Sequence, residues 1–289
     1  MLNGKKWNAA QYADPCVFLL GGFDGLHIGH KKLFDFASAF SLPVGVMTMT
    51  GVKGKSLFTL SERREIFAAQ GASFSVELSF TDELKNTPKE VFLDRLQKRV
   101  AARAFVCGKD FRFGQNAGGT PAFIREYTGI PAYDVDIYEV EGRKVSTTLV
   151  KELLSSGKVK EANALLVQPF FLRQTVEEGR KTGRTLGFPT ANMTYPEGKF
   201  LLKEGVYAAH AFLDGKRFDG IANVGACPTF GVETVRAETY FDGFAGDLYG
   251  KEVTVYFDGY LRKIENFGSA QRLQAQLKRD MERVRRGDF

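Results

Sequence analysis

The spacing of apolar residues changes near residue 167, and this change constrains the fold more than any other feature of the sequence. Before it, short apolar runs such as residues 16–23 and 42–49 alternate with segments of helical spacing. After it, short β-rich runs are separated by Gly and Asp-Gly turns. The chain has 289 residues, which is enough for two hydrophobic cores. We therefore predict two domains, residues 1–167 and 168–289.

The first domain should be an α/β domain. Strand and helix patterns that alternate along a chain are typical of a parallel, Rossmann-like sheet with helices on both faces. Ligands of such sheets bind at the carboxyl ends of the strands, where this sequence has glycine turns. One helix is predicted within residues 87–100, with Thr87 as its N-cap, Pro88 at the first helical position and Glu90 closing a capping box.

The second domain should be an antiparallel β-barrel or sandwich, because its short strands are separated by tight turns. Near the end of the chain the apolar residues return to helical spacing, at Leu273, Leu277, Met281 and Val284. We predict a terminal helix there, closing a β-barrel domain.

Composition narrows the classes of protein. No apolar run reaches the roughly 18 residues of a membrane span, and the N-terminus lacks a signal-peptide core, so we expect a cytoplasmic protein with no membrane partner. Cys16, Cys107 and Cys227 are far apart with apolar neighbours, which predicts buried free thiols. The net charge is +6, and basic clusters in residues 177–190 and 277–289 carry part of this excess. Nucleic acid, nucleotide phosphates or solubility would explain it, and a solvated helix face is the simplest interpretation of the tail.

Two of the three histidines lie in GGFDGLHIGHKKLF, residues 21–34. His27 and His30 would share one face at the start of a helix, where backbone N–H groups and the helix dipole favour an anion. The glycines would let the backbone approach a phosphate, and the imidazoles could stabilise charge developing on it. Two alternatives stay open. A zinc pair lacks the usual i, i+4 spacing and further ligands, and the histidines could simply cap and pack the helix.

The segment GFDGLHIGH resembles the signature of the nucleotidyltransferase superfamily, which shares its HxGH box with class I aminoacyl-tRNA synthetases. The resemblance implies that both histidines are catalytic and contact a nucleoside triphosphate during nucleotidyl transfer. The ATP-binding residues that it implies here are Gly22, Phe23, Asp24, Gly25, His27 and His30.

Two later stretches, VCGKDFRFGQNAGGT and VSTTLVKELLSSGKV, resemble those of bacterial FAD synthetases and follow at the expected distances. The contacts that they imply are Asp110, Phe111 and Asn116 for FMN, and Ser146, Thr147 and Lys151 for ATP. Hydroxyl side chains are good helix N-caps and phosphate ligands, and a lysine one turn inside the helix adds positive charge. A capped surface helix without a ligand is the alternative interpretation of the second stretch.

The sequence departs from the FAD synthetase pattern twice. Lys151 stands where the family usually has an arginine, and lysine cannot make the same bidentate phosphate contact. Residues 47–55, MTMTGVKGK, replace a TFDPHP-like segment and lack its acidic residue and histidine. Lys53 and Lys55 could bind phosphate in compensation. An alternative interpretation is therefore a riboflavin kinase whose N-terminal domain is degenerate and only binds nucleotide or regulates.

A second candidate site lies in GRKTGRTLGFPTANM, residues 179–193. Its glycine backbones and cationic side chains suit phosphate, but it is not a Walker A box, because Arg184-Thr185 stands where Lys-Ser/Thr is required. The stretch closely resembles the riboflavin kinase signature GxxxGRxLGFPTAN. Segments that resemble the rest of that family follow in order to near the end of the chain.

This second resemblance implies a complete set of kinase residues. The implied roles are ATP binding by Gly179, Lys181, Gly183, Thr190 and Asn192, Mg²⁺ binding by Thr190 and Asn192, general-base catalysis by Glu238, and flavin binding by Glu238 and Arg262. The residue types suit the reaction, because phosphoryl transfer to a hydroxyl needs a carboxylate to accept the proton and hard oxygen ligands for Mg²⁺. Without the resemblance, Glu238 would be interpreted as an exposed strand carboxylate.

The resemblances together predict a bifunctional enzyme that uses ATP to convert riboflavin to FMN and FMN to FAD. We expect flavins, ATP and Mg²⁺ as its ligands and no nucleic acid partner, and self-association stays open. Two further alternatives remain. A tRNA-binding or aminoacylating module would use the HIGH box, but KVSTT is a poor match to a KMSKS loop. A non-catalytic flavin carrier would not need Glu238 or the glycine-rich loop.

Overall fold

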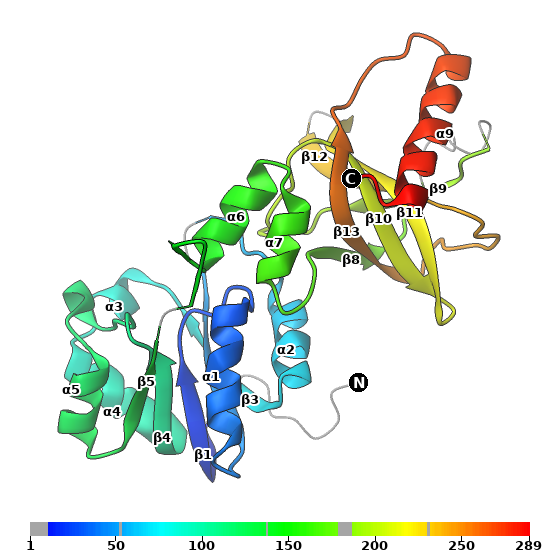
Figure 1. Ribbon diagram of the computed structural model, residues 1–289. Coiled ribbons are helices and arrows are strands. Elements are labelled where there is room, and N and C mark those ends of the chain that lie inside the picture. Colours follow the sequence, from blue (N-terminus) through cyan, green and yellow to red (C-terminus); the bar gives the residue numbers. More distant parts are fainter. Residues whose placement is uncertain (1–10, 52–53, 137, 179–186, 230–231) are drawn as a thin grey trace. The chain divides into compact units, whose positions relative to one another are not determined.

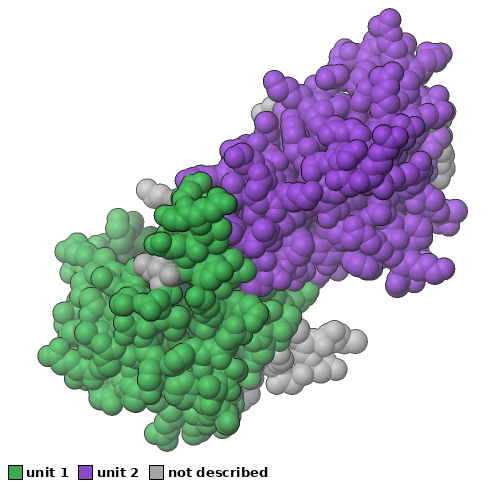
Figure 2. Space-filling model, viewed as in Figure 1, with its two compact units in different colours: residues 1–149 green, residues 150–289 purple. Residues whose placement is uncertain are grey.

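The computed structural model describes residues 11–51, 54–136, 138–178, 187–229 and 232–289. The chain divides into two compact units, residues 1–149 and 150–289 (Figure 2). The predicted boundary at residue 167 lies further along the chain than this division.

Unit 1 is built on a parallel sheet of five strands in the order β3-β2-β1-β4-β5 (Figure 1). Its strands are β1 (Tyr12–Leu20), β2 (Val44–Thr50), β3 (Ala72–Ser79), β4 (Val100–Gly108) and β5 (Ala132–Val135). The predicted α/β fold is therefore confirmed. The carboxyl ends of the central strands β1 and β4 lead directly into the loops at residues 21–27 and 109–120.

Helices pack against this sheet through alternate residues of β1. The helices are α1 (Ile28–Ser38), α2 (Leu60–Ala69), α3 (Asp82–Lys85), α4 (Lys89–Arg99) and α5 (Pro121–Thr128). Cys16, Phe18 and Leu20 share a core with α4 and α5. Phe34 of α1 and Phe67 of α2 pack together beside Phe23. A 3₁₀ turn, η1 (Gln115–Ala117), and a hairpin of β6 (Glu139–Val140) and β7 (Arg143–Lys144) complete the unit.

The predicted start of the fourth helix is wrong by one residue. Pro88, and not Thr87, is the N-cap of α4, and no side chain caps the helix. Thr87 instead donates its hydroxyl to the carbonyl oxygen of Glu83 at 2.8 Å and accepts the backbone N–H of Gln115 on its own carbonyl. Pro88 itself has an extended ψ of 145°, so the helix begins at Lys89 and Thr87 lies one residue before the N-cap.

Unit 2 contains an antiparallel sheet of six strands in the order β8-β13-β10-β11-β12-β9. The strands are β8 (Phe171–Thr175), β9 (Thr190–Thr194), β10 (Gly205–Leu213), β11 (Lys216–Thr229), β12 (Val232–Phe241) and β13 (Glu252–Arg262). The end strands approach each other at a bridge between Glu177 and Asn192, which nearly closes the sheet into the predicted barrel. Inward-facing residues such as Tyr207, Ala222 and Phe257 are fully buried.

The described residues of this region form the helices α6 (Thr147–Ser155), which crosses the division between the units, α7 (Val159–Leu165) and α9 (Ala270–Arg286). The predicted terminal helix is confirmed as α9. Met281 is buried, and Leu277 and Val284 pack with it against the outer face of the barrel. The tail is more than a solvated helix face, since Arg283 donates to the carbonyl of Leu261 and Arg285 pairs with Asp242.

The prediction of buried free thiols is confirmed for Cys16 and Cys107. The side chain of Cys227 lies outside the described part of the structure. Among the described residues, no helix is long and apolar enough to cross a membrane.

Candidate active sites

The two histidines of unit 1 form a compact pair at the start of α1. His27 is the N-cap, and its Nδ1 accepts the backbone N–H of His30 at 3.2 Å. His30 Nδ1 lies 3.0 Å from the carbonyl oxygen of Gly25, to which it donates. The rings are stacked, with centroids 3.6 Å apart. The histidines therefore do cap and pack the helix, and these contacts also fix both rings in one orientation.

Burial keeps both imidazoles neutral near pH 7. Burial, and next the positive charge of Lys144, lowers the pKa of His27 to about 4. The pKa of His30 is also lowered well below its ordinary value, mainly by burial and then by His27. Since Nδ1 of His27 accepts a hydrogen bond and Nδ1 of His30 donates one, neutral His27 carries its proton on Nε2, while Nε2 of neutral His30 is an acceptor. The pair thus offers one donor and one acceptor to a ligand.

A buried arginine on α2 stabilises the loop that precedes the histidines. Arg63 of α2 is 3% exposed and donates through Nη1 to the Thr48 hydroxyl at 2.9 Å and to the Met49 carbonyl at 2.8 Å. Thr48 in turn donates to the carbonyl of Gly22 at 3.1 Å. Asp24 anchors the other side by accepting the backbone N–H of Leu57 at 3.2 Å. Arg63 had no role in the sequence analysis, and its helical position alone gives no signal of this contact.

The glycines of the loop serve different purposes. A Cβ at Gly25 would lie 2.8 Å from Leu57, so this glycine is required by packing. A Cβ at Gly22 would meet no atom within 4 Å, so backbone there faces open space that a phosphate could occupy. Phe23 has a positive φ of 43° and directs its ring into the core, against His30. The side chain of Phe23 is therefore used for packing.

The predicted FMN-binding stretch follows β4. Asp110 is exposed and pairs with Lys144 of β7. Phe111 stacks on Phe113 and packs against the core, and Asn116 is exposed with a left-handed backbone in η1. The sequence analysis missed Lys144. Its positive charge contributes to the lowered pKa of both histidines.

The second signature of this unit lies at the start of α6. Ser146 precedes the helix and accepts the backbone N–H of Leu149 at 3.2 Å, as a helix N-cap does. Thr147 is the first helical residue, and Lys151 lies one turn further, beyond the division between the units. Of the two compensating lysines, Lys55 is exposed, and Lys53 lies outside the described residues.

The barrel brings three predicted kinase residues onto one line across its strands. Asn192 of β9 is directly opposite Glu238 of β12, and Glu238 is opposite Asn223 of β11. The line continues through Val206 of β10 to Arg262 of β13. Directly opposed residues point to the same face of a sheet. We call Asn192, Glu238, Asn223, Val206 and Arg262 the cross-strand row.

The polar groups at the β9 end of the row are available to a ligand. The amide nitrogen of Asn192 donates to the backbone carbonyl of Thr190 at 3.2 Å and approaches the Thr190 hydroxyl at 3.4 Å. The amide oxygen of Asn192 therefore points away from Thr190. The Glu238 carboxylate is exposed and makes no hydrogen bond or ion pair with the described part of the chain. A free carboxylate beside hydroxyl and amide oxygens suits proton acceptance and Mg²⁺ binding.

Arg262, at the other end of the row, is held by the terminal helix. Its Nη2 lies 2.8 Å from Asp280 of α9, and its Nε donates to both carboxylate oxygens at 3.0 and 3.2 Å. Asp280 is fully buried and also accepts from Gln276. The guanidinium also lies over the ring of Phe267. Arg262 thus attaches α9 to the row.

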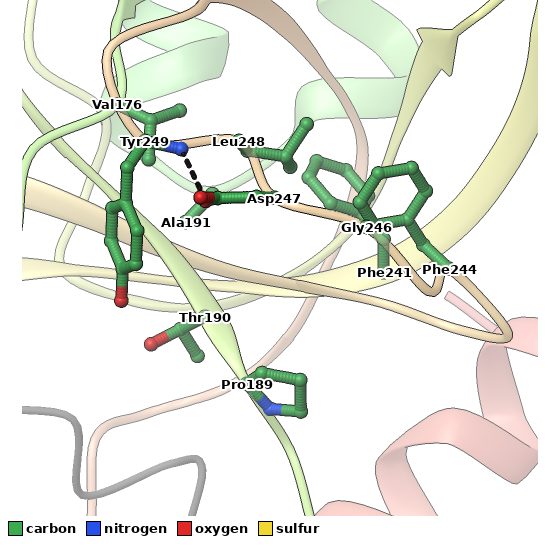
Figure 3. A pocket seen from close by; sticks show the side chains of 10 residues that line it. All are labelled: Val176, Pro189, Thr190, Ala191, Phe241, Phe244, Gly246, Asp247, Leu248 and Tyr249. Atoms are coloured by element: carbon green, nitrogen blue, oxygen red, sulfur yellow. Dashed lines mark hydrogen bonds between the residues drawn. The ribbon is translucent and has the colours of Figure 1, made fainter.

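A pocket lies beside Thr190 (Figure 3). Pro189, Thr190 and Ala191 line it from the start of β9, and Phe241, Phe244 and the loop to Tyr249 line it from the end of β12. Asp247 lies within this loop and accepts the backbone N–H of Tyr249 at 3.0 Å. The predicted ATP residues Gly179, Lys181 and Gly183 lie outside the described residues.

Comparisons with known proteins match both units. The FAD synthetase family model matches residues 9–149, and the riboflavin kinase model matches residues 166–287. A bifunctional riboflavin kinase/FMN adenylyltransferase of Pseudomonas fluorescens is 30% identical over 287 residues, with 93% of this chain and 92% of that protein covered. The chain belongs to this bifunctional family.

Two other comparisons extend the relationship. A trifunctional RibF/MnmA protein of Mycoplasmoides gallisepticum is 29% identical, and the match covers 91% of this chain but only 38% of that longer protein. A solved structure from Streptococcus pneumoniae, titled a macrolide-efflux protein, has a TM-score of 0.86 and 29% identity, with 94% of this chain and 98% of that chain covered.

The family membership decides between the interpretations of the sequence. The protein is a transferase with both a riboflavin kinase domain and an FAD synthetase domain, acting on flavins and ATP. The alternative of a degenerate N-terminal domain is not favoured, because the FAD synthetase model matches that region despite its altered residues 47–55.

Proposed function

We propose that each unit carries one of the two reactions and that the residues described above perform them. The single observation that carries the kinase assignment is the cross-strand row, which brings Asn192, Glu238 and Arg262 to one face although they are far apart in the sequence. For the adenylyltransferase, the supporting observation is the fixed, neutral histidine pair at the start of α1.

In the kinase reaction, the 5′-hydroxyl of riboflavin attacks the γ-phosphorus of ATP. Glu238 accepts the hydroxyl proton, a P–O bond forms to the flavin, and ADP leaves, giving FMN. The pocket beside Thr190 supports binding of the nucleotide at the β9 end of the row. Arg262 lies at the opposite end, where the flavin would extend.

The residues at the β9 end fit Mg²⁺. The Thr190 hydroxyl and the Asn192 amide oxygen are hard oxygen ligands. The amide nitrogen faces Thr190 in the structure, so a turn of the amide would bring its oxygen to the same side as the Thr190 hydroxyl. When bound, Mg²⁺ would neutralise charge on the phosphate oxygens. The two side chains would hold it together with oxygens of ATP.

In the adenylyltransferase reaction, a phosphate oxygen of FMN attacks the α-phosphorus of ATP, and pyrophosphate leaves, giving FAD. His27 donates a hydrogen bond from Nε2 to the phosphate that gains charge, while the open backbone at Gly22 lets the triphosphate approach. Ser146 and Thr147 would contact phosphate oxygens from the start of α6, with Lys151 adding charge. Asp110, Phe111 and Asn116 would line the FMN side, and opening the Asp110–Lys144 pair would free both groups.

A chromatographic time course tests the two assignments. Wild-type protein given riboflavin and Mg-ATP should produce FMN and then FAD. The double variant His27→Ala/His30→Ala should accumulate FMN and form FAD at least about 100-fold more slowly, because it lacks the groups that stabilise the developing charge. Wild-type protein that stops at FMN, even when FMN and ATP are supplied, would remove the adenylyltransferase assignment and leave that of the kinase.

A further inference from the structure

Asn223 occupies the centre of the cross-strand row, although neither the sequence analysis nor the proposed mechanism gives it a role. It lies on β11 directly opposite Glu238 on one side and Val206 on the other. Its side chain therefore shares the face of the Glu238 carboxylate. Its Oδ1 is buried and accepts no hydrogen bond within the described structure.

An unpaired buried amide oxygen is unfavourable and needs an explanation. Such an acceptor has lost its hydrogen bonds to water on burial and gained none in return. The torsion that orients an asparagine amide is broad, so the group can turn its oxygen toward a donor that arrives on the open face. A ligand that carries hydroxyl groups would provide that donor.

The order of residues along the cross-strand row indicates which hydroxyl of the substrate would donate to Asn223. The nucleotide pocket and Thr190 define the phosphate end, and Glu238 comes next. The substrate hydroxyl at Glu238 faces the triphosphate, so the rest of the substrate must extend the other way, over β11 toward Arg262. Asn223 is one strand further, about 4.8 Å away. That distance corresponds to the hydroxyls one or two carbons from the end of an extended polyol chain.

We propose that Asn223 determines specificity for the ribityl chain by accepting a hydrogen bond from its 3′- or 4′-hydroxyl. This inference rests on the proposed kinase function of the row. It makes Asn223 a substrate-binding residue on the flavin side of Glu238, whereas Asn192 serves the nucleotide side.

Binding of flavins to the full chain tests the proposal without requiring turnover. Quenching of flavin fluorescence gives the Kd of riboflavin, 3′-deoxyriboflavin and 4′-deoxyriboflavin for wild type, Asn223→Ala and Asn223→Ser. The kcat/KM values for the same flavins and the KM of ATP are measured in parallel. Asp219→Asn is the matched control, because Asp219 lies on the same strand and face but four residues from the row. Thermal unfolding establishes that each variant is folded.

The expected result is a coupling between residue and hydroxyl. Asn223→Ala should weaken riboflavin binding about tenfold, the effect of one lost hydrogen bond, and leave the KM of ATP unchanged. Against the deoxyflavin that lacks the contacted hydroxyl, the same variant should bind as wild type does. Asp219→Asn should change neither quantity.

Two results would overturn the proposal. Equal weakening of all three flavins by Asn223→Ala, or an unchanged Kd for riboflavin, excludes a contact to the ribityl hydroxyls. If Asn223→Ala does not fold, the Asn223→Ser data decide in the same way. Failure of the proposed kinase function is distinguishable, because it would appear as absence of FMN formation by the wild type whatever the binding results.

Discussion

The two candidate sites are assembled in opposite ways. The histidine pair is fixed by contacts within six residues, from the Gly25 carbonyl to the ring of His30. The cross-strand row draws its residues from five strands that span residues 192–262. One site is a property of a local loop, and the other is a property of the register of a whole sheet. A short motif can therefore fix the orientation of two neighbouring side chains, whereas the surroundings of the Glu238 carboxylate depend on the register of the entire sheet.

The largest effect should come from Glu238, the one carboxylate of the row. Glu238→Gln removes the proposed proton acceptor while keeping the shape of the side chain, so the rate of FMN formation should fall by about 10²–10⁴-fold. FAD formation from supplied FMN should not change. Initial rates of both reactions measure this, with Glu252→Gln, an exposed glutamate on β13, as control. Equal loss of both reactions would show that the two sites are not independent.

The next largest effect should come from Asp280, because it is fully buried against Arg262. Asp280→Ala leaves the guanidinium without its partner and should destabilise the barrel unit by about 3–5 kcal/mol. Arg262→Met/Asp280→Leu, which removes both charges, should cost less. Denaturant unfolding of the variants measures the difference. A double variant as unstable as Asp280→Ala would mean that the ion pair is not the reason α9 is attached.

The histidine pair should make the protein less stable to unfolding at acidic pH. The pKa of His27 is 6.5 in the unfolded chain and about 4 in the folded one, so the folded state binds fewer protons. Its contribution to the free energy of unfolding is complete above pH 6.5 and is lost as the pH falls toward about 4. The full loss corresponds to about 3 kcal/mol. Urea unfolding of wild type and His27→Asn at pH 7 and 4.5 measures it. The same pH dependence in both proteins would contradict the assignment.

A smaller effect, on the pKa of the two histidines, is expected when Lys144 is replaced. Its positive charge lowers the pKa of both histidines, so Lys144→Met should raise both pKa values. NMR titration of the ring protons measures the direction. Lys109→Met is the control, because Lys109 is an exposed lysine at the start of the loop after β4 and pairs with Asp136. No change in Lys144→Met would place the lysine too far away to act on the pair in solution.

Sequence reasoning reached the parallel sheet, the barrel and the terminal helix because periodicity reports burial on each element. It found His27 at a helix start because capping is local. It assigned Glu238, Asn192 and Arg262 only through resemblance, since strand register cannot be derived from local pattern. The pairing of Val206 with Arg262, for example, lies beside a register shift between β10 and β13. Lys144, Arg63 and Asn223 were missed for the same reason, because their partners are distant in sequence.

The position of Asn192 has a consequence for the integrity of the barrel. This residue forms the bridge with Glu177 that joins the two end strands, with the Glu177 N–H 2.8 Å from the Asn192 carbonyl. If this contact between the two end strands opens, their unpaired backbone groups can pair with strands of other chains. A nucleotide bound at Asn192 would keep the two end strands together. ATP would then protect this protein against aggregation as well as serve as its substrate, and a chain without nucleotide should be the form that proteases cut and that precipitates first.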